Sequence, residues 1–334
     1  MVTGADLTAA MDVLAADTWR RLEHGTPRGL APAEESITDH VLFELNQQFP
    51  AICVYKPSKK EEARSGADWE WWVGSPERGW LCLRVQAKRI YGKNYRELSH
   101  TPKGSTSRQI DLLIKGCDRP GYLPYHVFYN GWEGRRFGNT PTPADTEQLE
   151  RNLRYFPHQS WQPFLIQNPC NRMGLEVVQL GSRSPRWWGC AALSSYHVRQ
   201  LMQHSRQRHY APRYLRHAMP WSMLFSDTAE TRIRDHVSSE LTDSVDVLHW
   251  RLLADSSIHQ DTQFGPSPPS ADYSLLQHQR VEDLPDYVWA VLELRDVEPE
   301  ALNRHLAEQV PADYLVLTDL SRFDRSASSV PFRF

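Results

Sequence analysis

The segment from Ala67 to Ile90 constrains the fold of this chain most strongly, because it predicts two neighbouring strands joined by a turn. Residues Ala67–Val73 alternate in character, which is typical of a strand with two different faces. Gly74–Gly79 has the composition of a turn, and Trp80–Ile90 is the next apolar strand. The segment therefore predicts a β-hairpin within a larger sheet.

Other segments predict helices and strands on both sides of this hairpin. We expect helices at residues 1–24, from Glu34 to Pro50, at Ser105–Lys115 and at Ala191–Gln203, and strands at Ile52–Tyr55, Tyr125–Tyr129, Trp289–Leu294 and Tyr314–Leu317. From the second helix onward the order is helix, three strands, helix, strand. This order predicts an α/β fold around a mixed central sheet, with late strands completing the sheet.

The chain divides into two parts by composition. Residues 1–33 predict an N-terminal helix and a linker rich in Pro and Gly, and residues 34–325 predict the main domain, with its core at about 34–131. No apolar run reaches the roughly 20 residues that cross a bilayer, and the N-terminus resembles an amphipathic helix rather than a signal peptide. We therefore expect a cytoplasmic protein with no membrane partner.

Charge and cysteine content exclude several classes of protein. The net charge is −3, so any contact with nucleic acid must come from a local basic face or from metal ions in an acidic site. The five cysteines contain no C-x-x-C pair, which predicts buried, reduced thiols rather than a zinc site or a disulfide framework. Core packing is the favoured interpretation of the tryptophan clusters, and base stacking or a partner surface is the alternative.

Polar residues on the two hairpin strands predict a metal-and-phosphate site. Asp68 lies on the first strand, and Gln86 and Lys88 lie two residues apart on the second, so they project from one face. A carboxylate, an amide oxygen and the Ala87 backbone carbonyl are hard ligands suited to Mg²⁺ or Mn²⁺. Lys88 would orient water or neutralise the charge of a phosphoryl transition state. The alternative is an ordinary sheet, in which Gln86 is satisfied in the core and Lys88 pairs with a surface acid.

Further ligands are expected from nearby segments. Glu35, at the start of the second helix, is the preferred additional carboxylate, and we expect it to be both a metal ligand and a catalytic residue. Glu34 and Asp39 are the alternatives to Glu35. Glu35 and Asp39 lie one helical turn apart, so both could face the sheet. Glu70 is another candidate ligand, and Gln109 could contact a phosphate or order the lysine.

The pattern E…GAD…QAK resembles the PD-(D/E)XK, or restriction-endonuclease-like, nuclease superfamily. More narrowly, the stretches EESIT, EEARSGADWEWW, VQAKRIY, RQIDLLI and YHVFYN, followed by WWGCAAL, HAMPW and DYLVLTDLSRF, resemble an uncharacterised bacterial domain family suspected of being such nucleases, over residues 34–325. The resemblance implies an αβββαβ core with helical N-terminal and C-terminal additions, and cleavage of phosphodiesters with Mg²⁺. Asp68 and Lys88 match catalytic positions of the superfamily, whereas Gln86 stands in place of its usual acid, as in some subfamilies.

A basic segment at residues 197–217 is a second candidate for contact with nucleic acid. Its arginines, among them Arg206, Arg208 and Arg213, are interleaved with Tyr210 and suit phosphate contact and base stacking. A solvated helix face balanced by acids is the alternative. The histidines of this segment lack the i, i+4 spacing of a zinc site on a helix.

These observations lead to the expectation of a metal-dependent endonuclease that acts on DNA. By analogy with the family, defence against phage is the expected context. Two alternatives stay open: an inactive nuclease scaffold that binds nucleic acid or protein, favoured by Gln86 and the acidic net charge, and an RNA-directed nuclease. Homo-oligomerisation is also open.

Overall fold

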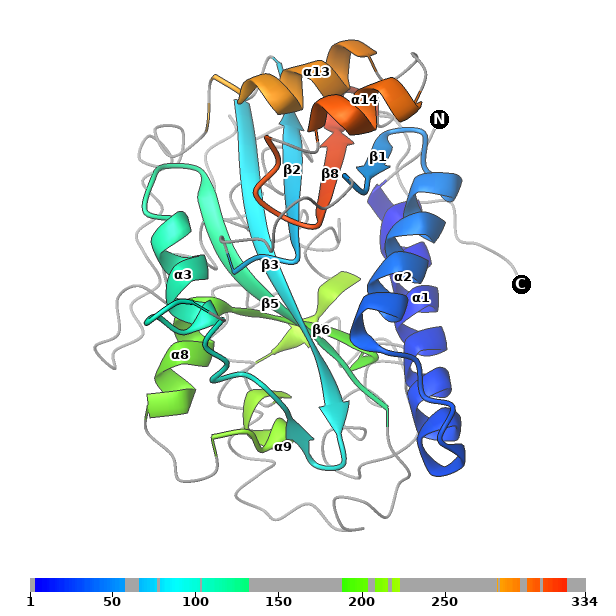
Figure 1. Ribbon diagram of the computed structural model, residues 1–334. Helices are drawn as coiled ribbons and strands as arrows, with labels where there is room; N and C mark the ends of the chain where they lie inside the picture. The colour runs from blue at the N-terminus through cyan, green and yellow to red at the C-terminus, as the bar shows by residue number, and fades with distance from the viewer. Residues whose placement is uncertain are drawn as a thin grey trace, which may run out of the picture.

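The chain forms a mixed α/β fold around one mixed sheet (Figure 1). The computed structural model describes residues 4–57, 66–76, 79–102, 104–131, 188–203, 208–215, 218–222, 281, 283–294, 299–306 and 309–322. Within these ranges, the predicted hairpin is confirmed. The late strand at Tyr314–Leu317 also joins the same sheet, as expected.

The sheet runs in the order β1-β8-β2-β3-β5-β6-β7, and a short strand, β4, pairs with β3 at its end. The strands are β1 (Ile52–Tyr55), β2 (Trp69–Ser75), β3 (Gly79–Tyr91), β4 (Asn94–Tyr95), β5 (Tyr122–Tyr129), β6 (Cys190–Ser194), β7 (Met219–Pro220) and β8 (Tyr314–Asp319). β2 pairs with β8 in parallel and with β3 in antiparallel orientation, and β3 pairs with β5 in parallel. The sheet is therefore mixed, as predicted, and β8 lies between β1 and β2.

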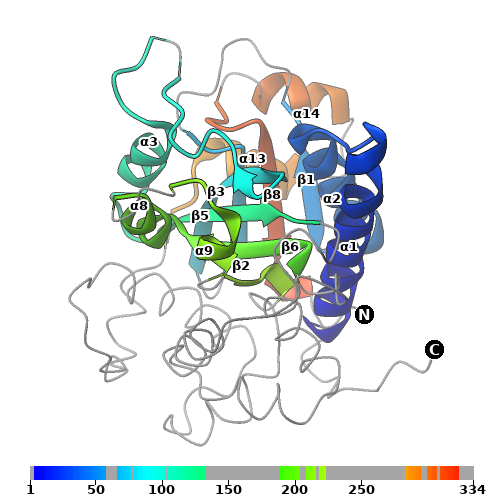
Figure 2. The same ribbon diagram turned by 90° about the horizontal axis from the view of Figure 1, so that it is seen from below.

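Helices cover both faces of this sheet (Figures 1 and 2). The helices are α1 (Gly4–Gly25), η1 (Thr26–Arg28), α2 (Glu34–Gln48), α3 (Gln109–Gly116), α8 (Ser195–Gln203), α9 (Ala211–Leu215), α13 (Asp286–Leu294), α14 (Pro299–Leu306) and η4 (Leu320–Arg322). On β5, Tyr129 bonds Thr38 of α2, whereas His126 contacts Ser195 of α8. Positions 126 and 129 lie on opposite faces of a strand, so α2 and α8 cover opposite faces.

The alternation of β2 explains how its tryptophans are distributed. Trp69 and Trp71 pack into the larger core cluster with α1 and α2, whereas Trp72 packs with the cluster that contains α13 and α14. All three indole rings are buried, which confirms core packing for this tryptophan cluster. Trp187 lies outside the described residues, and its neighbour Trp188 is buried.

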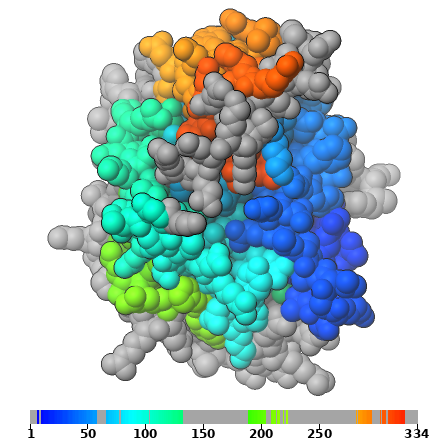
Figure 3. Space-filling view, viewed as in Figure 1, coloured from blue at the N-terminus to red at the C-terminus, as the bar shows by residue number. Residues whose placement is uncertain are grey.

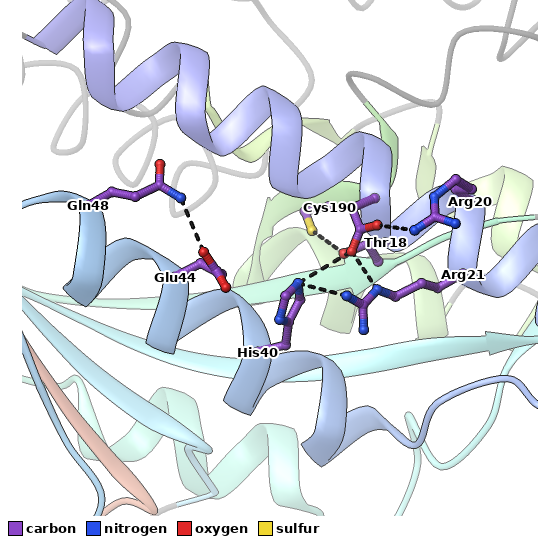
Figure 4. A network of polar contacts seen from close by, with 8 residues as sticks. Thr18, Arg20, Arg21, His40, Glu44, Gln48 and Cys190 are labelled. Atoms are coloured by element: carbon purple, nitrogen blue, oxygen red, sulfur yellow. Dashed lines mark hydrogen bonds and ion pairs between the residues drawn. The ribbon is translucent and has the colours of Figure 1, made fainter.

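The N-terminal helix α1 packs into the same core as the sheet, through an apolar face that includes Leu7 and Met11. A polar seam also joins α1 to α2 (Figure 4). The Asp17 carboxylate accepts hydrogen bonds from Arg20 and Arg21 and lies 3.3 Å from His40 of α2. The helix predicted at residues 1–24 is thereby confirmed as a structural layer of the sheet.

Three predicted elements differ from the structure. The segment Trp289–Leu294 is the end of α13 and not a strand, because its apolar residues form a helical stripe that is buried against the second core cluster. The helix predicted from Ala191 begins only at Ser195, because residues 190–194 pair with β5. The helix predicted from Ser105 begins at Gln109, since the Ser105 hydroxyl instead bonds the backbone of Ser107 in a local turn.

The cysteines match their predicted state wherever the structure describes them. Cys82, Cys117 and Cys190 are buried free thiols, Cys53 is a partly buried one, and Cys170 lies outside the described ranges. Within the same ranges, no helix has the length and apolar character needed to span a bilayer.

Candidate active site

The candidate site lies just before the first residue of β2, where one edge of β3 continues without a partner strand from β2. Trp69 is the first residue of β2 and pairs with Val85, and the backbone N–H of the preceding residue, Asp68, donates to the Val85 carbonyl at 2.8 Å. β3 pairs with β2 as far as Val85 and with β4 from Ile90 onward. Between these two residues, in the described part of the chain, side chains and not a neighbouring strand accept hydrogen bonds from the backbone N–H groups on this edge of β3.

Two carboxylates bond the amide groups of this edge. Asp68 Oδ2 accepts a hydrogen bond from the Ala87 N–H at 2.6 Å, and Glu34 Oε2 accepts one from the Arg89 N–H at 2.7 Å. The N–H and C=O groups of one extended residue point the same way, so the Ala87 carbonyl lies on this edge too. The two carboxylates therefore flank one backbone carbonyl.

Lys88 supplies the positive charge of the cluster. Its side chain is buried, and its Nζ lies 3.4 Å from Glu34 Oε1. Burial raises the pKa of Asp68 to about 7; the charge of Lys88 opposes this increase and the charge of Glu34 adds to it. Asp68 is partly buried as a whole residue, and its carboxyl group is desolvated. A carboxyl group of this kind binds a proton or a cation readily near neutral pH.

The Gln86 side chain is the least satisfied group of the cluster. It is 1% exposed, and neither its Oε1 nor its Nε2 has a hydrogen-bond partner among the described residues. A buried amide without partners is costly and is therefore uncommon in folded proteins. The orphaned amide lies next to Ala87 in sequence, and thus beside the edge that Asp68 and Glu34 flank.

The structure brings Glu34, rather than Glu35, to Lys88. Glu35 and Asp39 are exposed on α2, because the buried face of this helix is formed by other residues, such as Thr38. Asp39 accepts hydrogen bonds from Lys56, after β1, at 2.7 Å and from Tyr314 of β8 at 2.6 Å. Asp39 therefore reaches the sheet at β8 but not Lys88, and the rival residue Glu34 takes the place expected for Glu35.

Glu70 belongs to a separate network and is not free to bind a ligand. Its carboxylate is fully buried and accepts hydrogen bonds from Arg84 Nε at 2.8 Å, from Tyr287 at 2.7 Å and from Trp72. Arg84 also donates to the carbonyl of Gly116 at 3.1 Å. The expectation that Glu70 could be an additional ligand is therefore corrected: Glu70 is fully buried and pairs with Arg84, so it does not join the cluster around Lys88.

The helix α3 approaches the site through its first turn. Gly66 has a φ of 75°, and a Cβ at this position would lie 2.4 Å from the Gln109 carbonyl oxygen. Only glycine accommodates this conformation and this close approach. Gly66 thus fixes the path of the chain two residues before Asp68. The Gln109 side chain is partly buried at this turn.

Comparison with models of protein families identifies the family of this chain. A family model described as "Family of unknown function (DUF6615)" matches residues 7–319. The chain belongs to this family. The matched range of DUF6615 includes most of α1, both hairpin strands and β8, and it contains every residue of the candidate site. No curated protein matches the sequence.

Part of the basic segment lies against the far end of β3. The Tyr95 N–H of β4 donates to the His209 carbonyl, and the Ala211 N–H donates to the Lys93 carbonyl, both at 2.8 Å. These two bonds hold the start of α9 beside the β3–β4 turn.

The residues predicted to contact nucleic acid differ in their exposure. Arg208 is exposed, Tyr210 and Arg213 are partly buried, and Arg206 lies outside the described residues. Tyr210 also forms an isolated β-bridge with Asn94 of the β3–β4 turn. Among the described members of the set, Arg208 is therefore the residue most accessible to a phosphate.

His126 and Ser195 are polar residues near the site that sequence reasoning did not identify. His126 pairs with Gln86 across β3 and β5, and its Nδ1 lies 2.8 Å from Ser195 Oγ. Burial and the charge of Lys88 lower the pKa of His126 to about 3, so its ring is neutral. The only signal in the sequence is one histidine within an apolar strand, and its partner lies 69 residues further on.

Proposed function

We propose that this chain is a metal-dependent endonuclease that hydrolyses phosphodiester bonds in DNA. One observation carries the proposal: the carboxylates of Asp68 and Glu34 bond the edge of β3 on either side of the Ala87 carbonyl, beside the buried Lys88, and the preceding residue, Gln86, has an orphaned buried amide. Buried polar groups without partners are uncommon, and a ligand that satisfies them gives such a group a role. Defence against phage DNA is the context that the family resemblance suggests.

The donor set fits a hard divalent cation. Asp68, Glu34, Gln86 Oε1 and the Ala87 carbonyl would hold it, and oxygen ligands of this kind are those that Mg²⁺ and Mn²⁺ prefer. Among the residues that the structure describes, no three His, Cys, Asp or Glu side chains form a metal-binding group. The proposed site draws half of its ligands from an amide and the backbone, so it needs only two carboxylates.

The side chains divide the work of hydrolysis in this proposal. Water adds to the phosphorus atom, the bond to the leaving oxygen breaks, and that oxygen takes up a proton. A bound cation would polarise the phosphoryl oxygen and acidify the water. Lys88 neutralises the charge that develops on the phosphoryl oxygens. Glu34 holds the Lys88 ammonium group in place, and Asp68 would hold the cation beside it.

The order of elements supports the superfamily resemblance as a proposal. From α2 to β5 the chain runs helix, three strands, helix, strand, with only the two-residue β4 in addition. Asp68 and Lys88, the two positions that match the superfamily, lie in one cluster. β8 separates β1 from β2, so the αβββαβ order holds along the chain while the first strand is not a direct neighbour of the second.

Cleavage of plasmid DNA tests the function. The wild-type chain is expected to cleave with Mg²⁺ or Mn²⁺, whereas Asp68→Asn and Lys88→Ala are expected to lose at least about 100-fold in rate, the typical effect of removing charge stabilisation. Glu35→Gln is the matched control, because it changes an exposed acid next to Glu34. Equal cleavage by wild type, Asp68→Asn and Lys88→Ala would reject this site.

The second candidate function is a binding module on a nuclease scaffold. Gln86 favours it, because an amide lacks the negative charge that a cation ligand of the superfamily usually provides. Binding of DNA without cleavage, across several divalent metals, would support this alternative. Parallel assays on matched DNA and RNA substrates separate the DNA-directed enzyme from the RNA-directed one.

The β3–β4 turn offers a path for the nucleic acid next to the site. Lys93 is exposed on this turn, Arg96 is exposed directly after β4, and Arg208 is exposed on the segment that bonds to the turn. In Figure 3, cyan atoms of the chain segment that includes this turn reach the surface between green atoms of the α8–α9 region and blue atoms of the N-terminal helices. A phosphate backbone on this path would extend from Lys88 along the basic turn.

Removal of the basic groups tests this path. Replacing Lys93 and Arg208 together by alanine is expected to weaken DNA binding and to make it less dependent on salt. The log–log slope of affinity against salt should fall by about one unit for each phosphate that is no longer neutralised. Arg206→Ala combined with Arg208→Ala tests the basic segment in the same way. Binding that stays unchanged at every salt concentration would contradict this path.

A further inference from the structure

The Gln86 and His126 side chains occupy matching positions on neighbouring strands. β3 and β5 pair in parallel without interruption from Cys82 opposite Tyr122 to Arg89 opposite Tyr129, and Gln86 pairs with His126. Paired residues of adjacent strands project from the same face, and the strands lie about 4.8 Å apart. The two side chains are therefore neighbours on the face that α8 covers.

Both side chains carry buried polar atoms without partners. His126 is 0% exposed, and its Nε2 has no hydrogen-bond partner among the described residues. Within the same part of the chain, Gln86 lacks partners for its Nε2 and its Oε1. Two neighbouring orphans of complementary chemistry satisfy each other when a donor of one meets an acceptor of the other.

Ser195 determines which nitrogen of His126 is left for Gln86. Ser195 Oγ lies 2.8 Å from Nδ1, and both residues are buried, so this contact fixes the ring from the α8 side. A neutral imidazole has one donor and one acceptor nitrogen. If Nδ1 donates to Ser195, Nε2 is an acceptor; if Nδ1 accepts from Ser195, Nε2 carries the proton.

We propose that His126 is a positioning residue for Gln86: its Nδ1–H donates to Ser195 Oγ, and its Nε2 is the acceptor that the Gln86 amide nitrogen reaches by a change of side-chain rotamer, since the two atoms are not bonded to each other in the structure. This arrangement occupies the NH₂ end of Gln86 and turns Oε1 toward the edge where Asp68 and Glu34 lie. The inference rests on the proposed function, because it makes Gln86 a cation ligand. The opposite tautomer would occupy Oε1 and direct the NH₂ group outward, where it repels a cation.

Nitrogen-15 NMR of the full-length, metal-free chain tests the tautomer. With ¹⁵N-labelled histidine, the His126 signals are identified by their disappearance in His126→Gln. The proposal predicts protonated Nδ1 and unprotonated Nε2. Protonated Nε2 in the wild-type chain would overturn the inference, whatever the chain does with DNA.

Titration of Mn²⁺ into the same protein tests the consequence. His126→Phe removes the acceptor and keeps a buried ring, and it is expected to raise the dissociation constant for Mn²⁺ by roughly 10-fold or more, as removal of a group that orients a metal ligand does. His126→Gln, which restores an acceptor oxygen, is expected to bind close to the wild-type level. An unchanged dissociation constant in His126→Phe would overturn the inference.

A matched pair of serines controls for packing and for misfolding of the histidine variants. Ser195→Ala removes the partner of Nδ1 and is expected to weaken Mn²⁺ binding. Ser194→Ala removes a buried hydroxyl that has no partner among the described residues and is expected to leave Mn²⁺ binding unchanged. Equal effects of both changes would count against the inference. If the wild-type chain binds no Mn²⁺, and so behaves like Asp68→Asn, the proposed function is rejected. The role of His126 toward a cation is then rejected too.

Discussion

Two acid–base clusters lie side by side on β2 and β3, and they differ in how fully their polar groups are bonded. In the first, Glu70 faces Arg84, and both oxygens of the Glu70 carboxylate accept hydrogen bonds. In the second, just before the start of β2, Asp68 lies close to the buried Lys88, and the amide of Gln86 has no partner among the described residues. The same pair of strands thus carries one satisfied and one unsatisfied cluster.

The difference indicates that the first cluster stabilises the fold, whereas the second is the one that we propose binds a ligand. A satisfied buried ion pair holds elements together: Glu70 and Arg84 connect the hairpin to α13 through Tyr287 and to α3 through the Gly116 carbonyl. Buried groups without partners weaken a fold, so they persist where a ligand satisfies them. Changes in the first cluster should therefore affect unfolding, and changes in the second should affect activity.

The largest expected effect is on stability, from Glu70→Ala. Removing this carboxylate leaves Arg84 buried without its partner, which typically costs about 3–5 kcal/mol of the free energy of unfolding. Urea denaturation of the variant measures this decrease, and Glu35→Ala, which changes an exposed acid, is the control. A decrease below about 1 kcal/mol, the value for an exposed pair, would show that the Glu70 network does not stabilise the fold.

In contrast to Glu70→Ala, Asp68→Asn should lower the activity and leave the stability nearly unchanged. Removal of the carboxylate charge should lower the rate of DNA cleavage by roughly 100-fold or more while the chain stays folded, since asparagine keeps an oxygen that accepts from the Ala87 N–H. Cleavage kinetics and urea denaturation of the same preparation measure both quantities. A variant that unfolds as readily as Glu70→Ala would remove the distinction between the two clusters.

Tyr287→Phe removes one donor from the satisfied cluster and tests it more gently. The Tyr287 hydroxyl donates to Glu70 Oε2 at 2.7 Å, and a hydrogen bond to a charged group contributes about 1.5–3 kcal/mol. The free energy of unfolding should fall by about this amount, with the Mn²⁺ affinity unchanged. A change in Mn²⁺ affinity would mean that the two clusters are coupled.

The free energy of unfolding should depend on pH through the desolvated carboxyl group of Asp68, in the second cluster. The pKa of Asp68 is about 7 in the folded chain and about 3.9 in an unfolded one, so the folded state binds the proton more tightly. Between these two values, this group lowers the stability as the pH rises, by at most about 1.4 kcal/mol per pH unit. In metal-free buffer, Asp68→Asn should lack this contribution; an identical pH profile in both proteins would contradict the assignment.

Local sequence patterns were sufficient to predict much of the hairpin and its helices. Alternation predicted the two faces of β2, and helical periodicity with Pro50 predicted α2 to within two residues. Trp289–Leu294 was wrongly predicted to be a strand, because a short apolar run has no clear period. In the structure it is the end of helix α13, whose apolar residues are buried in the second core cluster. Tertiary context, which local patterns do not contain, also set the start of α8 at Ser195, after a strand that pairs with β5.

The residues of the candidate site could be grouped from the sequence where they share one hairpin, and not where the fold brings in other elements. Asp68, Gln86 and Lys88 could be grouped from strand spacing alone. Which of Glu34 and Glu35 faces Lys88 depends on how α2 is rotated about its axis. Two neighbouring glutamates in a sequence do not show this rotation. The role of β5 could not be found from spacing, because the relation of its histidine to Gln86 depends on the register between β3 and β5.

Crystals soaked in Mn²⁺ provide the most direct test of the central claim, that the unsatisfied cluster at the β3 edge is a cation site. Anomalous diffraction locates the metal without any assumption about activity. We predict a peak within coordination distance of the Asp68 carboxylate, the Gln86 Oε1 and the Ala87 carbonyl. No peak at this edge at saturating Mn²⁺, or a peak only at other carboxylates, would contradict the claim.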